Sequence, residues 1–213
     1  ISPSMKKGEF DAIIFDLGGV ILEVDYARPV AAFIQLGYTD FDTLYGKAQQ
    51  ASLFDQLEKG LISGEAFVDS VKEVLPNAST QQIIYAWNSI IVDFPPNRLD
   101  FLKTVSAQLP AFLLSNTNEI HERSFNSLLQ EKHNAENMHG FFTKAFLSHE
   151  IHLRKPDVEA FKYVLEDQGL IPERTLFLDD LPQHVAAARS VGIQAIQLKS
   201  IHDLEDVLAP LLA

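Results

Sequence analysis

The sequence predicts an α/β fold in which helices cover a parallel β-sheet and a small helical domain is inserted after the first strand. Short apolar runs with the length of buried strands lie at Ala12–Phe15, Ala111–Leu114, Ala145–Leu147, Thr175–Leu178 and Gln194–Leu198. Helical patterns separate the later runs, and this alternation implies right-handed crossovers in a layered core of Rossmann-like type. The long segment between the first two runs has helical spacing and no convincing strand.

The first apolar run ends in a carboxylate on a flexible turn. Asp16 follows the run directly and precedes Leu17, Gly18 and Gly19. In open parallel sheets, ligands bind beyond the carboxyl ends of the strands, so we expect Asp16 to face a substrate. The two glycines allow backbone N–H groups to approach an anion closely. The same residues are also compatible with an Asp that only organises the turn.

The inserted segment carries three apolar stripes at helical spacing, which predict the core of a helical bundle. The stripes are Phe54, Leu57 and Leu61; Phe67, Val71 and Val74; and Ile83, Ile84, Trp87, Ile90 and Ile91. Pro95 and Pro96 mark the return of the chain to the sheet. We therefore expect a helical domain over residues 26–94 and an α/β core formed by residues 5–25 and 95–213.

The second apolar run ends in small hydrogen-bonding groups. Ser115, Asn116, Thr117 and Asn118 follow it, and a helix is expected to begin near Glu119. A hydroxyl group and the neighbouring amides can hold phosphoryl oxygens without adding charge. These residues could equally cap the following helix, and both roles can hold together.

Lys155 stands immediately before a predicted helix. Pro156 fits the first helical turn, and the helix that follows has apolar residues at Val158, Phe161 and Leu165. We expect the ammonium group of Lys155 to point toward the same end of the sheet as Asp16. Taken alone, a lysine is usually a solvated surface charge.

Asp179 and Asp180 end the fourth apolar run together. At about 4 Å and an effective dielectric constant of about 20, two like charges repel by roughly 4 kcal/mol, so the pair needs a cation or a shared proton. Oxygen ligands favour a hard ion, and Mg²⁺ is the expected choice beside phosphate. One of the two carboxylates could instead cap the helix that begins at Pro182.

The order and spacing of these four segments resemble those of the haloacid dehalogenase-like hydrolase superfamily, over essentially the whole chain from Phe10. The resemblance implies that Asp16 is a nucleophile that becomes an aspartyl-phosphate. It also implies that Ser115 and the backbone of Asn116 bind the transferring phosphoryl group, while Lys155 steadies that group and the nucleophile. The inserted helices resemble the cap domain with which this family closes its active site and selects substrates.

The same resemblance implies a Mg²⁺ site. The side chain of Asp16, the carbonyl group of Gly18 and Asp180 would be direct ligands, with Asp179 supporting the ion directly or through water. The charges of three carboxylates, Lys155 and one divalent ion then cancel before substrate enters. Without the ion, a phosphate dianion would meet a negatively charged site, so we expect Mg²⁺ to be required.

Two positions depart from the family pattern. Many family phosphatases have a second Asp two residues after the nucleophile, where it protonates the leaving group, but here that position is Gly18. Loss of a general acid–base normally lowers the rate by about 10²- to 10⁴-fold. Nearby candidates for a replacement are Glu23, Asp25 and Tyr26. The second departure is His184, at a position where relatives often have Asn or Asp.

These motifs favour a phosphatase that acts on a sugar phosphate. The Gly18 turn and the surrounding motifs look like those of bacterial α-D-glucose-1-phosphate phosphatases, and the anomeric oxygen of a hexose 1-phosphate leaves more easily than an ordinary alcohol. The alternatives are a 2-haloacid dehalogenase, which needs no leaving-group acid but also no metal, and a phosphate-ligand binding protein with little turnover. A phosphomutase would miss its usual proton shuttle at Gly18.

Composition limits the possible partners. A formal net charge of −12 argues against nucleic acid and anionic membranes as partners, and the absence of Cys excludes thiolate nucleophiles and disulfides. His149 and His152 have no third ligand at suitable sequence spacing for zinc. With no apolar stretch of membrane-spanning length and no signal-peptide pattern, we expect a cytoplasmic protein. We expect it to bind a small phosphate ester and to be a monomer or a homodimer.

Overall fold

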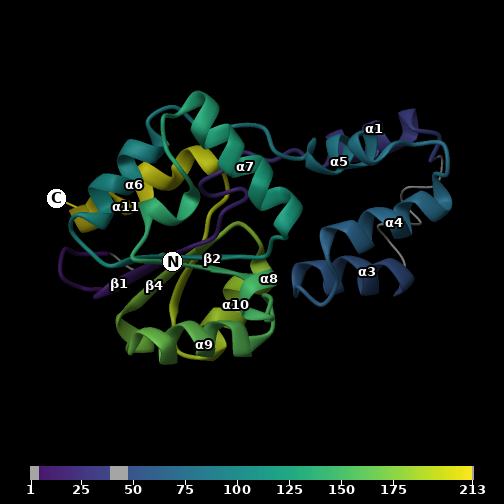
Figure 1. Ribbon diagram of the computed structural model, residues 1–213. Helices are drawn as coiled ribbons and strands as arrows, with labels where there is room; N and C mark the ends of the chain where they lie inside the picture. Colours follow the sequence, from purple (N-terminus) through teal and green to yellow (C-terminus); the bar gives the residue numbers. More distant parts are fainter. Residues whose placement is uncertain (1–4, 39–47, 213) are drawn as a thin grey trace.

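A parallel β-sheet lies at the centre of the structure, as the sequence predicts (Figure 1). The computed structural model describes residues 5–38 and 48–212. Five strands pair in the spatial order β3-β2-β1-β4-β5. They are β1 (Ala12–Phe15), β2 (Ala111–Ser115), β3 (Lys144–Leu147), β4 (Thr175–Asp179) and β5 (Gln194–Gln197). Each predicted strand is confirmed to within one residue at either end.

The apolar side chains of β1 explain its central position. All four of its residues are completely buried. Ile13 and Phe15 belong to the core on one face of the sheet, and Ala12 and Ile14 to the core on the other. Successive side chains of a strand point to opposite faces, so an all-apolar strand must be covered on both. The edge strand β5, by contrast, exposes its two glutamines.

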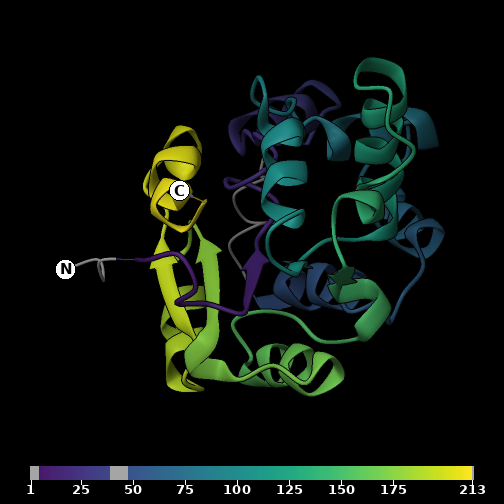
Figure 2. The ribbon, with the colours of Figure 1, turned by 90° about the vertical axis from the view of Figure 1, so that its left-hand side faces the viewer.

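Helices cover both faces of the sheet. Leu102, Phe125 and Leu208 bring α6, α7 and α11 onto one face, whereas Phe161 and Val185 bring α9 and α10 onto the other. Figures 1 and 2 both show α9 on the opposite side of the sheet from α6 and α7. The bounds are α6 (Arg98–Ser106), α7 (Glu119–Lys132), α8 (Ser148–Ile151), α9 (Val158–Gln168), α10 (Pro182–Ser190) and α11 (Leu204–Leu212), with 3-10 turns η1 (Met138–Phe141), η2 (Pro172–Arg174) and η3 (Ile201–Asp203).

The segment between β1 and α6 forms a group of helices beside the sheet, shown at the right of Figure 1. These helices are α1 (Ala27–Gln35), α3 (Ala48–Glu58), α4 (Gly64–Val74) and α5 (Thr80–Asn88). They enclose an apolar core of their own, which includes Phe33, Phe67 and Trp87. Residues 39–47 of the predicted helical domain lie outside the described residues.

Four members of the predicted apolar stripes are not in this core: Ile90 and Ile91 are half-buried elsewhere, and Leu61 and Val74 are exposed. Leu61 is 64% exposed because α3 ends at Glu58, so the helical spacing no longer applies to it. Val74, the last residue of α4, is 52% exposed. The rest of each stripe is buried or half-buried among the described residues.

The two connections between the helices and the sheet run side by side. Val24 and Ile91 form an antiparallel bridge. The backbone N–H of Glu23 donates to the carbonyl of Asp93 at 2.9 Å, and that of Asp25 donates to the carbonyl of Ile90 at 2.9 Å. These bonds lie close to the expected boundaries of the helical domain. Within the two described ranges, no helix has both the length and the apolar character needed to cross a membrane.

A buried arginine ties the turn after β1 to the C-terminal helix. Arg98 is only 1% exposed. Its guanidinium group donates to the carbonyl oxygen of Val20, to that of Ile201 at 2.6 Å, and to the carboxylate of Glu205 at 2.9 and 3.0 Å. Sequence patterning gives no sign of this role, because arginine is ordinarily a surface residue. The contacts fix the backbone that follows Asp16.

We expect the substitution Arg98→Met to destabilise the fold. It keeps the apolar stem but leaves the carbonyl groups of Val20 and Ile201 without their donor. A buried polar group without a partner costs about 1–3 kcal/mol, so the free energy of unfolding should fall by roughly 2–5 kcal/mol. Urea denaturation followed by circular dichroism measures this change.

The matched control is Glu205→Gln, which retains an acceptor on the more exposed side of Arg98. Its expected effect on the free energy of unfolding is below about 1 kcal/mol. An Arg98→Met protein as stable as the wild type would contradict the anchoring role.

Candidate active site

The residues singled out at the ends of three strands meet at one edge of the sheet. Asp16 follows β1, Ser115 ends β2 and Asp179 ends β4. Strand β1 pairs in parallel with both β2 and β4, and the backbone N–H of Asp16 donates to the carbonyl of Leu178 at 2.9 Å. Parallel neighbours end at the same edge, so the three side chains lie close together in space although they are distant in sequence.

Lys155 lies at the centre of this group. Its Nζ atom is 2.8 Å from Oδ1 of Asp16 and 2.8 Å from Oδ2 of Asp179, and its side chain is completely buried. The expectation that Lys155 points toward Asp16 is therefore confirmed, and the surface-charge alternative is wrong. Burial alone would lower the pKa of Lys155, but the two carboxylates outweigh it and raise that pKa.

The backbone of Lys155 is held by Asn116. The Oδ1 atom of Asn116 accepts from the N–H of Lys155 at 2.9 Å, and its Nδ2 atom donates to the carbonyl of Lys155 at 2.8 Å. This pair of bonds joins the loop after β2 to the loop before α9. The side chain of Asn116 is thus committed to positioning Lys155, which leaves its backbone N–H as the group that can face a ligand.

Asp179 and Asp180 have different surroundings. Oδ1 of Asp179 accepts from the N–H of Leu181 at 2.9 Å, and its Oδ2 accepts a bond from Nδ1 of His184 at 2.9 Å. His184 therefore positions Asp179. The carboxylate of Asp180 instead lies against the turn after β1, where a Cβ atom added to Gly19 would stand 2.4 Å from Oδ2 of Asp180. A side chain at Gly19 would displace this carboxylate.

The negative charges of the site exceed what Lys155 can neutralise. Burial raises the pKa of Asp16 to about 7, although Lys155 opposes this rise. Burial and the charge of Asp179 raise the pKa of Asp180 to about 6. Burial also disfavours the charged form of Asp179, but Lys155 and His184 outweigh it and hold the pKa of Asp179 below its usual range. A cation would relieve this repulsion.

The residues fit a magnesium ion. Asp16, Asp179 and Asp180 each offer a carboxylate oxygen, and these atoms all lie within 4.8 Å of one another. An all-oxygen donor set favours a hard cation such as Mg²⁺. Gly18 lies in the turn beside them and lines the neighbouring cavity.

A cavity of about 190 Å³ opens beside these groups, between the sheet and the inserted helices. Ser115, Asn116 and Thr117 line it from the sheet side. The rest of its lining is Leu17, Gly18, Leu22, Val24, Tyr26, Glu58, Trp87, Ile90, Ile91, His121 and Phe125. A larger hollow of about 540 Å³ between α1 and α5 contains none of the predicted site residues.

One wall of the cavity is a stack of rings. Trp87 lies parallel to Phe54 at 4.9 Å and to His121 at 4.8 Å between ring centroids. Its indole nitrogen donates to Oδ1 of Asn118 at 3.4 Å, and the same oxygen accepts from the N–H of Ile120 and caps α7. The helix-cap interpretation is therefore confirmed for Asn118, whereas Ser115 lines the cavity and its phosphoryl-binding role stays a prediction.

Ion pairs join α3 to the loop that carries Lys155. Nη1 of Arg154 lies 3.2 Å from Oδ1 of Asp55, and Nη2 of Arg154 lies 2.9 Å from Oε2 of Glu58. Beside them, Nδ1 of His152 is 2.7 Å from the carbonyl oxygen of Lys59. Sequence reasoning missed Glu58 and Arg154, because no periodic pattern connects residues so far apart. The adjacency of Arg154 to Lys155 was the one available signal.

Of the three suggested replacements for the missing acid, one reaches the cavity. Glu23 and Asp25 are exposed, and Oδ1 of Asp25 accepts from the N–H of Ala27 at 2.9 Å at the start of α1. Tyr26 lines the cavity. Tyr26 is 61% exposed as a residue, but the partial burial of its phenol and the charges of Asp180 and Asp16 raise its pKa to about 12.

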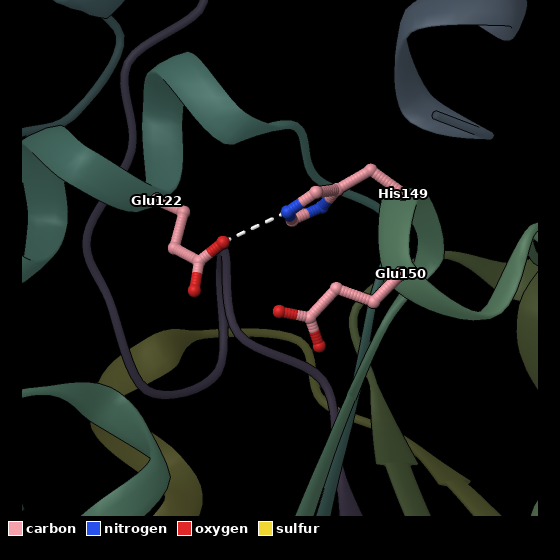
Figure 3. Close-up of side chains that lie close together, drawn as sticks. All are labelled: Glu122, His149 and Glu150. Carbon is pink, nitrogen blue, oxygen red and sulfur yellow. Dashed lines mark hydrogen bonds and ion pairs between the residues drawn. The ribbon is translucent and has the colours of Figure 1, made fainter. Parts of the chain in front are cut away.

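A second cluster of ionisable side chains lies at the N-terminal end of α7 (Figure 3). Nε2 of His149 is 2.8 Å from Oε2 of Glu122, and Glu150 points toward the same space. The sequence spacing did not reveal these two carboxylates beside His149, and His152 lies with Lys59 instead. The bond between His149 and Glu122 accounts for the arrangement, so we assign no metal to it.

Comparisons with known proteins agree with this geometry. A curated D-ribitol-5-phosphate phosphatase from Bacteroides thetaiotaomicron is 28% identical over 201 residues, which cover 94% of this chain and 97% of the relative. A HAD family enzyme from the same species, solved in complex with magnesium and inorganic phosphate, has 32% identity and a TM-score of 0.87. That match covers 93% of this chain and 98% of the other.

A predicted HAD-like family hydrolase from Porphyromonas gingivalis has 26% identity and a TM-score of 0.86, and the match covers 96% of this chain and 98% of the other. The profile of the haloacid dehalogenase-like hydrolase family matches residues 10–192. That range includes strands β1 to β4 and every residue of the predicted site. The chain therefore belongs to the haloacid dehalogenase-like hydrolase family.

Proposed function

We propose that this hydrolase is a Mg²⁺-dependent phosphatase that hydrolyses a small sugar or sugar-alcohol phosphate through an aspartyl-phosphate on Asp16. The observation that carries the proposal is the buried Lys155, which pairs with both Asp16 and Asp179, next to the turn at Gly18 that lines the cavity together with Ser115. The similarity to a D-ribitol-5-phosphate phosphatase supports the substrate class. A hexose 1-phosphate remains our proposed sugar phosphate, because its leaving oxygen is the more acidic one.

In the first step, the carboxylate of Asp16 attacks phosphorus and the bond from phosphorus to the ester oxygen breaks. In the second, water attacks the same phosphorus and the bond to Asp16 breaks, which releases phosphate and restores the carboxylate. Lys155 favours the charged form of Asp16 that attacks, and it holds the side chain in the same direction before the attack and after the carboxylate is restored.

The phosphoryl group is bound at the end of β2. The hydroxyl group of Ser115 and the backbone N–H of Asn116 supply donors there, and Lys155 supplies the positive charge. Asp16, the carbonyl of Gly18 and Asp180 would hold Mg²⁺, with Asp179 in support. When bound, the ion offsets the negative charge of the carboxylates and of the phosphoryl oxygens.

We propose that residues 26–94 form a cap that selects the substrate and excludes water. Support comes from the cavity between these helices and the sheet, and from the paired connections at Val24 and Ile91 that could act as a hinge. A volume of about 190 Å³ favours a small substrate. The expected cytoplasmic location and the monomeric or homodimeric state stay predictions.

The cluster of carboxylates at the site argues against the two alternative functions. A 2-haloacid dehalogenase has no use for the repelling pair Asp179 and Asp180, and a protein that only binds phosphate gains nothing from a buried Asp16 near the phosphoryl position. We therefore give preference to phosphoester hydrolysis.

The substitution Asp16→Asn should abolish turnover. An amide is not a competent nucleophile, so we expect the rate of phosphate release to fall by at least about 10⁴-fold. Circular dichroism should show an unchanged fold, since the substitution preserves shape. A variant with wild-type activity would overturn the assignment of the nucleophile.

Removal of divalent ions should also abolish turnover. Phosphate release from a panel of sugar phosphates, sugar-alcohol phosphates and an aryl phosphate is measured with Mg²⁺ and after treatment with EDTA. Because the three carboxylates would repel a phosphate dianion, we expect activity only with Mg²⁺ and recovery when the ion is returned. Chloride release from a 2-chloroacid, with no ester turned over, would favour the dehalogenase.

A further inference from the structure

The Gly18 position leaves the proposed reaction without an obvious proton donor. An alcohol is a poor leaving group unless its oxygen gains a proton as the bond to phosphorus breaks. The donor must reach the cavity that adjoins Asp16. Among the described residues, the ionisable side chains lining that cavity are Tyr26, Glu58 and His121.

His121 is poorly suited to the task. Its Nδ1 atom is 2.8 Å from Oδ1 of Asn88, and its ring is stacked on Trp87 at 4.8 Å. Burial lowers the pKa of His121 to about 3, so the ring is neutral at physiological pH. A neutral imidazole holds its remaining proton too tightly to act as an acid.

Tyr26 is also poorly suited. Burial and the nearby carboxylates raise its pKa to about 12. The phenol can therefore donate a hydrogen bond to a ligand, but full transfer of its proton is unfavourable near neutral pH. The anion that would result could not persist beside Asp16 and Asp180.

We propose that Glu58 of the inserted helices is the general acid–base of this enzyme, in the place of the acid that Gly18 lacks. This inference rests on the proposed phosphatase function. Glu58 is the last residue of α3, and it lines the same cavity as Ser115 and Asn116. Because Glu58 comes from the inserted helices and Ser115 and Asn116 come from the sheet, we infer that it meets the leaving-group side of a bound ester.

The position of Glu58 is fixed relative to the nucleophile. Nη2 of Arg154 lies 2.9 Å from its Oε2 atom, and Arg154 directly precedes Lys155, which contacts Asp16. The contact with Arg154 lacks hydrogen-bond geometry, so Oε2 is a buried oxygen that has no hydrogen-bond partner among the described residues. Oε2 thus has an ion-pair contact but an unused hydrogen-bonding position, which a substrate oxygen could fill.

The surroundings of Glu58 also suit a group that must gain and lose a proton. Burial raises the pKa of its carboxyl group, and the charge of Asp55 on the same helix acts in the same direction. Arg154 and Lys155, from the loop before α9, oppose that rise. The net direction is upward, toward the pH at which a general acid works best.

The proton balance closes over the two steps. As the bond from phosphorus to the ester oxygen breaks, its electron pair stays on that oxygen, which takes the proton of Glu58 and leaves as the alcohol. The Glu58 carboxylate then accepts a proton from the water that attacks the phosphorus of the Asp16 aspartyl-phosphate. Phosphate and the Asp16 carboxylate are released, and Glu58 is protonated again.

The test compares two leaving groups in the variant Glu58→Gln. A sugar or sugar-alcohol phosphate that the wild-type enzyme hydrolyses needs a proton on its leaving oxygen. The leaving group of p-nitrophenyl phosphate is nitrophenolate, a stable anion that needs no proton. Single-turnover release of the alcohol should fall by about 10²- to 10³-fold. The first-turnover burst of nitrophenolate should stay within about threefold of wild type, because that step needs no acid.

The matched control is Asp55→Asn. Asp55 lies on the same helix and pairs with the same Arg154, but it does not line the cavity. Because Asp55 makes only a lesser contribution to the pKa of Glu58, Asp55→Asn should lower the rate of alcohol release far less than Glu58→Gln does, and it should leave the nitrophenolate burst near the wild-type value. If Glu58→Gln lowers the single-turnover rates for both substrates equally, or lowers neither rate, the role of Glu58 as an acid is overturned and its contact with Arg154 is structural.

A pH profile of the wild-type enzyme tests the same inference without a variant. Protonated Glu58 is the active acid, so single-turnover alcohol release should decline as pH rises through its pKa, and the nitrophenolate burst should not show this decline. Identical profiles would contradict the proposal. A wild-type protein that hydrolyses neither ester with Mg²⁺ would instead refute the proposed phosphatase function itself.

Discussion

The site depends on one buried ammonium group placed between two carboxylates. A lysine that is completely buried must be paired, because an isolated charge in a protein interior costs several kcal/mol or more. Lys155 meets this requirement only if Asp16 and Asp179 end neighbouring strands and Asn116 holds the Lys155 backbone between them. Strand order, strand length and the loop before α9 are thus all constrained by the same contact.

The site has too much negative charge for Lys155 alone to balance. Asp180 lies against the Gly19 turn, and burial, with repulsion between the neighbouring carboxylates added to it, raises the pKa values of Asp16 and Asp180. His184 and the backbone of Leu181 give Asp179 fixed partners, so that carboxylate is the structural member of the group. In the proposed function, Asp16 and Asp180 are the carboxylates that bind the cation, and Asp16 also attacks the phosphoryl group.

Ion pairs connect the inserted helices to the loop that carries Lys155. A glycine at position 18 removes a carboxylate beside Asp16, where it would add to the repulsion among the existing carboxylates. If the acid is Glu58, proton donation requires α3 to lie against the Arg154 loop, as it does here. Arg154 precedes Lys155, so the docking of the helices and the position of the catalytic lysine are set by adjacent residues. Substrate enclosure and protonation would then occur together.

The sequence by itself determined the sheet and the location of the site. Buried parallel strands have apolar sequences, so they can be recognised from the sequence. The polar residues that end them, such as Asp16 and Asp179, meet at one edge of the sheet for any conformation of the loops. Local patterns could not reveal Arg98, Glu58 or Arg154, whose partners lie far along the chain and follow no period. Likewise, Leu61 fits an apolar stripe but lies beyond the end of its helix. Only the tertiary structure decided these, because long-range pairing depends on how the elements pack and not on the spacing within any one of them.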